Sequence, residues 1–377
     1  MVVHGPESAG PALRPAMHVP SLFVVTLLVP AAAQSFVSPA HFATVEAPSN
    51  SSVPFGYFVG PIRYQQIHDD VPPRTLTGLA FRHETNGQTR AAYSLTLDVF
   101  VSTAATTAAT ASTTFATNHG TDRLQVVTNR TLTVPGNDPS QLPSPFTLAI
   151  PFDAGVDFPF ARGASLCWEV QVTAWSTTAV VLFDAVLVPS IAPPTSWLAG
   201  TRSGLGCLAT GRTAPMTATP ANSVVDWNAG TGTFRVNGSQ LQSGGVFGWI
   251  TGTSTTQWNG LPLPSVLPST LGAPSGACTL YTDLGLLTVA TASGSGTAQL
   301  ALPFVPTAAL HGTVLCTQVL GLDATANALG LTTSNLVQQQ VVQPDPLPGR
   351  MARVFAVGSL AATGTLETNG CLVTRFD

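Results

Sequence analysis

The segment from residue 278 to residue 323 constrains the fold more than any other stretch of the chain. It alternates apolar, β-rich runs with Gly-Ser-Gly and proline, and it carries almost no charge. Short runs of this composition, bounded by glycine and proline, are typical of strands joined by turns. The segment therefore predicts β-hairpins.

The whole chain shares this low charge. Only 8% of its 377 residues are charged and 44% are hydrophobic, whereas soluble domains usually carry about a quarter charged residues. All 14 basic residues are arginine, and against 18 acidic residues they give a formal net charge of −4. Because no basic cluster is present to neutralise phosphates, the composition argues against nucleic-acid binding. A nearly neutral surface repels its copies weakly, so we expect self-association near the sequence pI of about 5.9.

The first 33 residues have the pattern of an export signal. Arg14 supplies a positive flank, residues 21–29 form an apolar core, and residues 31–33 are small alanines suited to cleavage. The alternative interpretation of this stretch is a buried strand. No later segment reaches the roughly 18 apolar residues that a membrane helix needs. We therefore predict that residues 1–33 are a cleaved signal peptide, and that the mature chain is secreted or faces the cell envelope without a membrane span.

Turn signals divide the mature chain into two strand-rich regions. We predict an all-β fold made of two tandem β-sandwich (jelly-roll-like) domains, at residues 34–190 and 203–345. Residues 191–202 are predicted to be a Pro-rich linker, because consecutive prolines do not enter a central strand. Residues 346–377 hold two short strand candidates that we expect to dock on one of the two domains, and the sequence leaves open which one.

One strand of the first domain shows its buried face directly in the sequence. Tyr93, Leu95, Leu97, Val99 and Val101 recur at period two, with polar residues at three of the four intervening positions. Successive side chains of a strand point to opposite faces of its sheet, so these five are predicted to face the core.

Short glycine-containing motifs follow one another through the second region. They are GLGC at residues 204–207, GACTLY at 276–281, LHG at 310–312 before CTQ at 316–318, and GLTTSN at 330–335. This order resembles a module that recurs at the C-terminal end of many uncharacterised secreted proteins of planctomycete-type bacteria. Residues 115–118 and 145–160 are similar to the domain that precedes it in some of them. The resemblance implies a secreted all-β protein and brings no catalytic residues, and Cys316 departs from its pattern.

Five cysteines in an exported chain leave at least one outside an intramolecular disulfide. We predict a disulfide between Cys207 and Cys278, because both lie in glycine-flanked turns that open strands. Closing a loop of that length stabilises by ~4 kcal/mol in the chain-entropy model. Cys316 and Cys167 lie in apolar surroundings and are predicted to be small buried hydrophobes. The pairing of Cys371 stays open.

The sequence contains no catalytic, cofactor or metal signature. Its histidines are scattered singly, and no cysteine or histidine spacing matches a zinc site. The nearest acidic constellation is His68-Asp69-Asp70, which precedes Pro72-Pro73 and is predicted to be a solvated loop. We therefore predict no cofactor and assign no catalytic or metal-binding residue.

Three tryptophans of the second region are candidates for sugar binding. They are Trp227, Trp249 and Trp258, and Asn228 and Asn259 directly follow two of them as partners for hydroxyl groups. Exposed aromatic faces stack on sugar rings. The alternative is that these rings fill a core in a chain whose aromatic content is only 7%. Trp258 lies between loop-like residues and is the candidate expected to be most exposed.

These observations leave three hypotheses for function. The first is a structural or adhesive protein of the cell exterior, without enzymatic activity, whose candidate partners are polysaccharide or other envelope components and its own copies. The second is a pair of carbohydrate-binding modules that recognise polysaccharide or other envelope components. The third is a hydrolase whose site the sequence does not reveal. An exposed row of tryptophans would favour the second hypothesis, and a histidine converging with a carboxylate in a cleft would favour the third.

Overall fold

Strands form nearly all the regular structure, as predicted. The prediction of β-hairpins in residues 278–323 was wrong, because the consecutive strands of this segment pair with strands from elsewhere in the chain and not with one another. The computed structural model is about 50% strand and 4% helix, and its sheets are antiparallel, which confirms the all-β fold. The residues it describes are Met1, Gly5, 35–57, 59–85, 89–138, 140–161, 163–187, 195–197, 200–267, 278–326, 329–344, 349–368 and 370–377. The predicted signal peptide therefore lies, except for Met1 and Gly5, outside the described residues. Residues 35–377 form one compact unit, distinct from residues 1–34.

The strands fall into two groups by their pairing, and the first group builds four sheets. Its six-stranded sheet consists, in order, of β28 (Thr365–Thr368), β27 (Met351–Val357), β3 (Ile62–His68), β10 (Leu166–Trp175), β6 (Tyr93–Thr103) and β7 (Leu124–Val134). Its four-stranded sheet consists of β1 (Phe36–Ser38), β30 (Thr374–Phe376), β5 (Gly78–Phe81) and β8 (Leu148–Pro151). The smaller sheets join β2 (Ser49–Ser51), β11 (Phe183–Leu187) and β29 (Gly370–Leu372), and pair β4 (Arg74–Leu76) with β9 (Phe158–Phe160). Short helical turns are η1 (Ala40–Phe42), η2 (Ala108–Thr110) and α1 (Phe115–Asn118).

The main core of the first group collects apolar side chains from its two larger sheets. The period-two face of β6 is buried as predicted, with all five side chains at most 5% exposed. Trp168 of β10 packs beside Phe81 of β5, with ring centroids 5.3 Å apart. Burial of rings and branched aliphatic chains of this kind is the dominant favourable term in folding.

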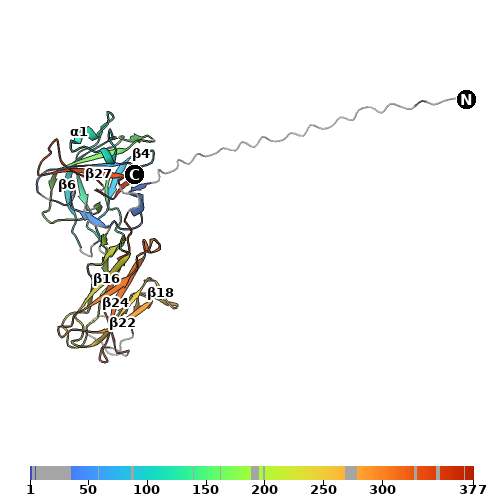
Figure 1. The fold of residues 1–377 in the computed structure, drawn as a ribbon, viewed down its shortest axis with the longest axis vertical. Coiled ribbons are helices and arrows are strands. Elements are labelled where there is room, and N and C mark those ends of the chain that lie inside the picture. The colour runs from blue at the N-terminus through green and yellow to red at the C-terminus, as the bar shows by residue number, and fades with distance from the viewer. Residues whose placement is uncertain are drawn as a thin grey trace. The chain divides into compact units, whose positions relative to one another are not determined.

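The end of the chain belongs to the first group. β27 pairs with β3, β29 pairs with β11, and β30 lies between β1 and β5. In Figure 1 the red strands of the chain's end lie among blue and green strands from its beginning. Residues 351–376 thus supply four strands, where the sequence indicated two, and their partners are in the first group.

The second group also builds two larger sheets. One contains, in order, β12 (Thr195–Trp197), β15 (Val224–Asp226), β16 (Thr231–Ser239) and β14 (Thr217–Pro220), with β23 (Ala298–Phe304) paired to β16. The other contains β13 (Gly200–Ser203), β26 (Leu336–Gln340), β24 (Val314–Leu322), β17 (Val246–Gly252) and β22 (Leu286–Thr291), with β25 (Leu331–Thr333) paired to β24. The remaining elements are β18 (Gln257–Trp258), β19 (Leu261–Pro262), β20 (Ser265–Val266), β21 (Thr279–Leu280) and η3 (Ala308–Leu310). β12 and the start of β13 fall inside the predicted linker, so that segment is partly strand.

The predicted disulfide is present. Cys207 and Cys278 are bonded, with their Cα atoms 4.9 Å apart and 71 positions apart in sequence. Cys167, Cys316 and Cys371 are buried and lie outside this disulfide. The bond joins the segment before β14 to the residue before β21, and the loop that it closes contains β14, β15, β16 and β17.

Candidate binding surface

The arrangement closest to a catalytic triad is buried in the first group. Ser102 Oγ lies 2.8 Å from His119 Nδ1, and His119 Nε2 lies 3.1 Å from Glu169 Oε2. Ser102 and Glu169 are fully buried and His119 is 7% exposed. Because a nucleophile has to meet its substrate, a hydroxyl without access to the surface does not serve as one.

The carboxylate of Glu169 is held by hydrogen bonds from neighbouring side chains. Arg63 donates to both of its carboxylate oxygens, at 2.9 and 3.1 Å, and Gln171 donates at 2.7 Å. Burial would raise the pKa of Glu169, but the hydrogen bonds from His119, Arg63 and Gln171 outweigh it and lower that pKa to about 2. Glu169 is therefore a permanent anion that ties β3 to β10.

His68 does not lie in a solvated loop, so that prediction was wrong. It is the last residue of β3 and is fully buried. Its Nε2 accepts hydrogen bonds from Trp168 Nε1 at 3.0 Å and from Gln66 Nε2 at 2.9 Å. Its proton therefore resides on Nδ1, which donates to Ser38 Oγ at 2.7 Å. Burial lowers the pKa of His68 to about 3, so the ring stays neutral.

The three tryptophans proposed as a sugar platform do not form an exposed row. Trp249 is 1% exposed and packs against Phe247 in the core, so it has no face open to a sugar. Trp227 is half-buried against the same core. Trp258 is half-buried against a small apolar cluster formed by Ile250, Leu263 and Leu280. Asn228 and Asn259 are exposed residues of turns.

A groove of about 380 Å³ opens between the two larger sheets of the second group. Its walls are mainly apolar and come from β16 and β23 on one side and from β22 and β24 on the other. They include Phe234, Leu302, Phe304, Leu286 and Leu315. The volume lies within the usual range for small-ligand sites, which is about 300–1,000 Å³.

Asp283 supplies the charge at the rim of this groove. Its Oδ1 accepts hydrogen bonds from the backbone N–H of Thr253 at 2.8 Å and of Ser254 at 2.7 Å. A Cβ on Gly252 would collide with the same oxygen. The carboxylate is thus fixed against the end of β17, where only glycine allows so close an approach.

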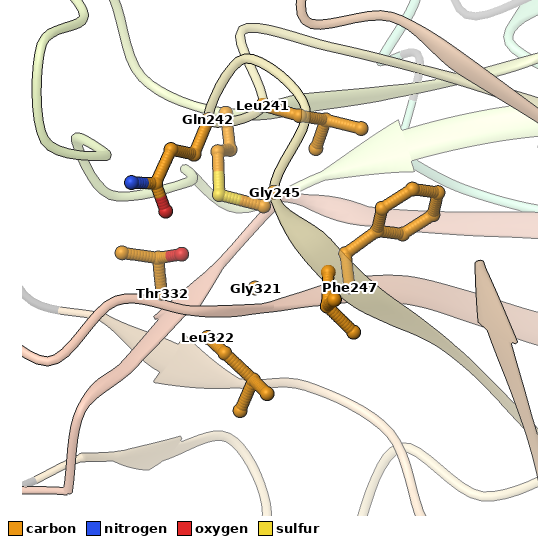
Figure 2. Close-up of a pocket in the computed structure, with 9 residues that line it drawn as sticks. Leu241, Gln242, Gly245, Phe247, Gly321, Leu322 and Thr332 are labelled. Carbon is orange, nitrogen blue, oxygen red and sulfur yellow. The ribbon is translucent and has the colours of Figure 1, made fainter. Parts of the chain in front are cut away.

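A second pocket in this group is too small for a ligand. Figure 2 shows it between the loop of Leu241, Gln242 and Gly245 and the side chains of Leu322 and Thr332. It holds about 10 Å³, which is roughly the space of one water molecule.

The most unusual surface is the edge that β22 leaves open. β22 pairs with β17 and ends its sheet among the described strands. Leu286 and Leu287 are 48% and 49% exposed, and Val289 is 63% exposed. No Asp, Glu, Lys or Arg occurs between Asp283 and Asp323. We call β22 with these three side chains the β22 edge. The uncharged run is visible in the sequence, but only the pairing shows that it ends a sheet.

Comparison with protein families, with curated proteins and with solved structures finds no match for this chain. Among the residues that the structure describes, no helix has the length and apolar character needed to cross a bilayer.

Proposed function

We propose that this protein is a secreted or cell-envelope structural or adhesive protein that associates with copies of itself through the β22 edge. The observation that carries the proposal is an edge strand that is apolar, uncharged and half exposed. The export pattern of residues 1–33, the resemblance to secreted planctomycete proteins and the buried disulfide support a location outside the cytoplasm.

The physical reason is the chemistry of an open sheet edge. Such a strand presents a row of N–H and C=O groups that a second strand satisfies, and natural proteins usually protect it with lysine, proline or a bulge. β22 contains neither lysine nor proline, and its pairing with β17 runs without a register shift. Pairing with the β22 of a second copy would continue the sheet and bury Leu287 and Val289. The same surface serves both copies, as a two-fold interface requires.

The two other hypotheses have weaker support. Of the three tryptophans proposed to bind sugar, Trp249 is buried in the core. Trp227 and Trp258 are half-buried against two different apolar clusters. Hydrolysis requires an accessible nucleophile, and the Ser102–His119–Glu169 arrangement is buried. We therefore place self-association first.

The test is sedimentation velocity on the mature chain and on Val289→Lys, across protein concentrations and towards pH 5.9. A lysine at an edge position opposes strand pairing through charge and hydration. We expect the wild type to associate with rising concentration and Val289→Lys to weaken association about tenfold or more, which corresponds to about 1.4 kcal/mol. Val180→Lys is the matched control, since Val180 is a 49% exposed valine of the first group.

Two results would contradict the proposal. One is a wild type that stays monomeric at every concentration. The other is an equal loss of association in Val289→Lys and Val180→Lys, because that would indicate a general effect of charge. Circular dichroism of each variant confirms that the fold is retained.

A further inference from the structure

The first group contains a buried cluster of carboxylates that neither a catalytic role nor the proposed assembly uses. Glu46 precedes β2, Glu84 follows β5, and Asp184 lies in β11. One carboxylate oxygen of each lies within 4.8 Å of the others. Glu46 and Asp184 are at most 1% exposed and Glu84 is 9% exposed. Three segments far apart in the sequence thus place acidic groups at one point.

Hydrogen bonds account for some of these oxygens. Asp184 Oδ1 accepts from the backbone N–H of Ala47 at 2.8 Å, and its Oδ2 accepts from Arg82 Nε at 2.7 Å. Glu46 Oε1 accepts from the backbone N–H of Ser144 at 2.5 Å. These contacts fix two of the three carboxylates in position.

Two oxygens have no such partner. Oε2 of Glu46 and Oε2 of Glu84 are buried without a hydrogen-bond donor. A buried carboxylate oxygen that lacks a donor loses its hydration without replacement, which is costly. Both groups belong to side chains that are nine-tenths buried or more, and both contribute to the same cluster. The unpaired oxygens are therefore available to a positively charged partner.

The charges of the cluster point to the class of that partner. If all three carboxylates ionise, they and the guanidinium of Arg82 sum to −3 + 1 = −2, a charge that the buried interior does not tolerate unless a cation or protons neutralise it. A divalent cation neutralises this charge. Oxygen donors without histidine or cysteine in the cluster suit a hard cation and not zinc. Ca²⁺ accepts bidentate carboxylates and irregular geometry, whereas Mg²⁺ prefers to keep several waters.

We propose that Glu46, Glu84 and Asp184 bind one Ca²⁺ ion. The ion would join the segment before β2 to β11 and to the residues that follow β5. Arg82 already donates to the carbonyl oxygens of Phe42 and Val45 and to Asp184, so the site would fasten the beginning of the described unit to its sheets. Its role would be structural, because the ligands are buried.

Protons are the competing partners. Burial and the neighbouring charges raise the pKa of Glu46 to about 8 and the pKa values of Glu84 and Asp184 above their usual range in the metal-free chain. Binding of a cation has to displace these protons, so metal affinity is expected to fall on acidification.

The test measures metal content and thermal stability of the full chain. The protein is unfolded and refolded in chelator or in about 1 mM Ca²⁺, the range in which extracellular modules bind this ion. It is then desalted and its calcium is measured by mass spectrometry. We expect one Ca²⁺ per chain at neutral pH and a Tm about 5 °C or more above that of the chelated protein. The same concentration of Mg²⁺ should give a smaller rise.

Glu84→Gln keeps the shape of the side chain and removes one charge. We expect this variant to lose the bound calcium and the calcium-dependent rise in Tm. Glu367→Gln is the matched control, since Glu367 pairs with Arg353 in the same group and is 39% exposed. This control should retain both the calcium and the rise.

Two results would overturn the site. The first is wild-type protein without stoichiometric calcium and with equal Tm in Ca²⁺ and in chelator, a result that does not depend on any variant. The second is a calcium-dependent rise that Glu84→Gln and Glu46→Gln retain in full, because this would place the ion elsewhere. Neither result bears on the β22 edge.

Discussion

The edge strands β7 and β22 differ in how they are protected against pairing with another chain. β7 ends the six-stranded sheet of the first group, and its pairing with β6 contains two register shifts. Arg130 on β7 also pairs with Asp153 at 3.4 Å. β22 ends its sheet in regular register and without a charged residue. Bulges and charges oppose pairing with another chain, so of these two edges the β22 edge is the one suited to association.

The first group also contains more charged residues than the second. Between residues 35 and 187 the chain has eighteen charged residues, and between 200 and 344 it has six, which are Arg202, Arg212, Asp226, Arg235, Asp283 and Asp323. The first group uses several of its charges internally, as in the pairs Arg63–Glu169 and Arg82–Asp184. We infer that the first group maintains a specific buried architecture and that the second group offers a surface for assembly.

The largest expected effect concerns the second group alone. Cys207→Ser combined with Cys278→Ser removes the loop closure, and we expect a loss of ~4 kcal/mol in the free energy of unfolding. Urea unfolding, with protection of each group followed by hydrogen exchange, measures it. The first group should keep its stability. An equal loss in both groups would show that they unfold as one unit, which would contradict the prediction that the disulfide stabilises the second group alone.

The next effect concerns the first group. Glu169→Gln removes the anion that Arg63 pairs with, and loss of one partner of a buried ion pair costs about 3–5 kcal/mol. We expect destabilisation of about 3 kcal/mol by urea unfolding, since Arg63 retains some exposure. Asp377→Asn, at the pair with Arg375 in which both side chains are about a third exposed, should cost below about 1 kcal/mol. If both substitutions had the same effect, burial of charge would not distinguish this group.

Acidification should weaken the first group through His68. Its pKa is about 3 in the folded chain, against an ordinary value of 6.5. The unfolded chain therefore binds the proton more readily, so this contribution to stability is complete above pH 6.5 and is lost as the pH falls towards 3. At about pH 5 the loss should be about 2 kcal/mol.

The check on this pH dependence is the difference between the wild type and His68→Gln. The raised pKa values of Glu46, Glu84 and Asp184 act with the opposite sign, since they favour the folded chain as the pH falls. Their contribution is common to both proteins and cancels in the difference. Unfolding curves of the two proteins that stay parallel between pH 7 and pH 4, within about 0.5 kcal/mol, would exclude the assigned role of His68.

The smallest expected effect is that of Trp258→Ala. The ring is half-buried against Ile250, Leu263 and Leu280, so we expect a loss of about 1–2 kcal/mol. A glycan array on the wild type and the variant measures sugar binding in parallel. Specific glycan binding by the wild type that the folded variant lacks would favour the carbohydrate hypothesis over self-association.

Part of this architecture could be predicted from the sequence. The period-two face of β6, the all-β class and the Cys207–Cys278 disulfide follow from local pattern and turn chemistry. The return of β27 to β3 could not be predicted, because pairing between strands nearly 300 positions apart leaves no local signal. Burial of His68 was missed because its partners Ser38 and Trp168 come from distant segments.

The two candidate sites also differ in how much of each can be predicted from the sequence. The uncharged run around β22 is evident in the sequence, but its position at the end of a sheet depends on pairing. The cluster of Glu46, Glu84 and Asp184 has no sequence motif, since its members lie on three separate segments.

The most direct test of the open edge is hydrogen exchange of the backbone amides of residues 286–291 as a function of protein concentration. If β22 pairs with a second copy, the amides that face away from β17 should become protected as concentration rises, whereas those of β7 should not change. Exchange of the β22 amides that is independent of concentration, in a sample that associates, would contradict assembly through this edge.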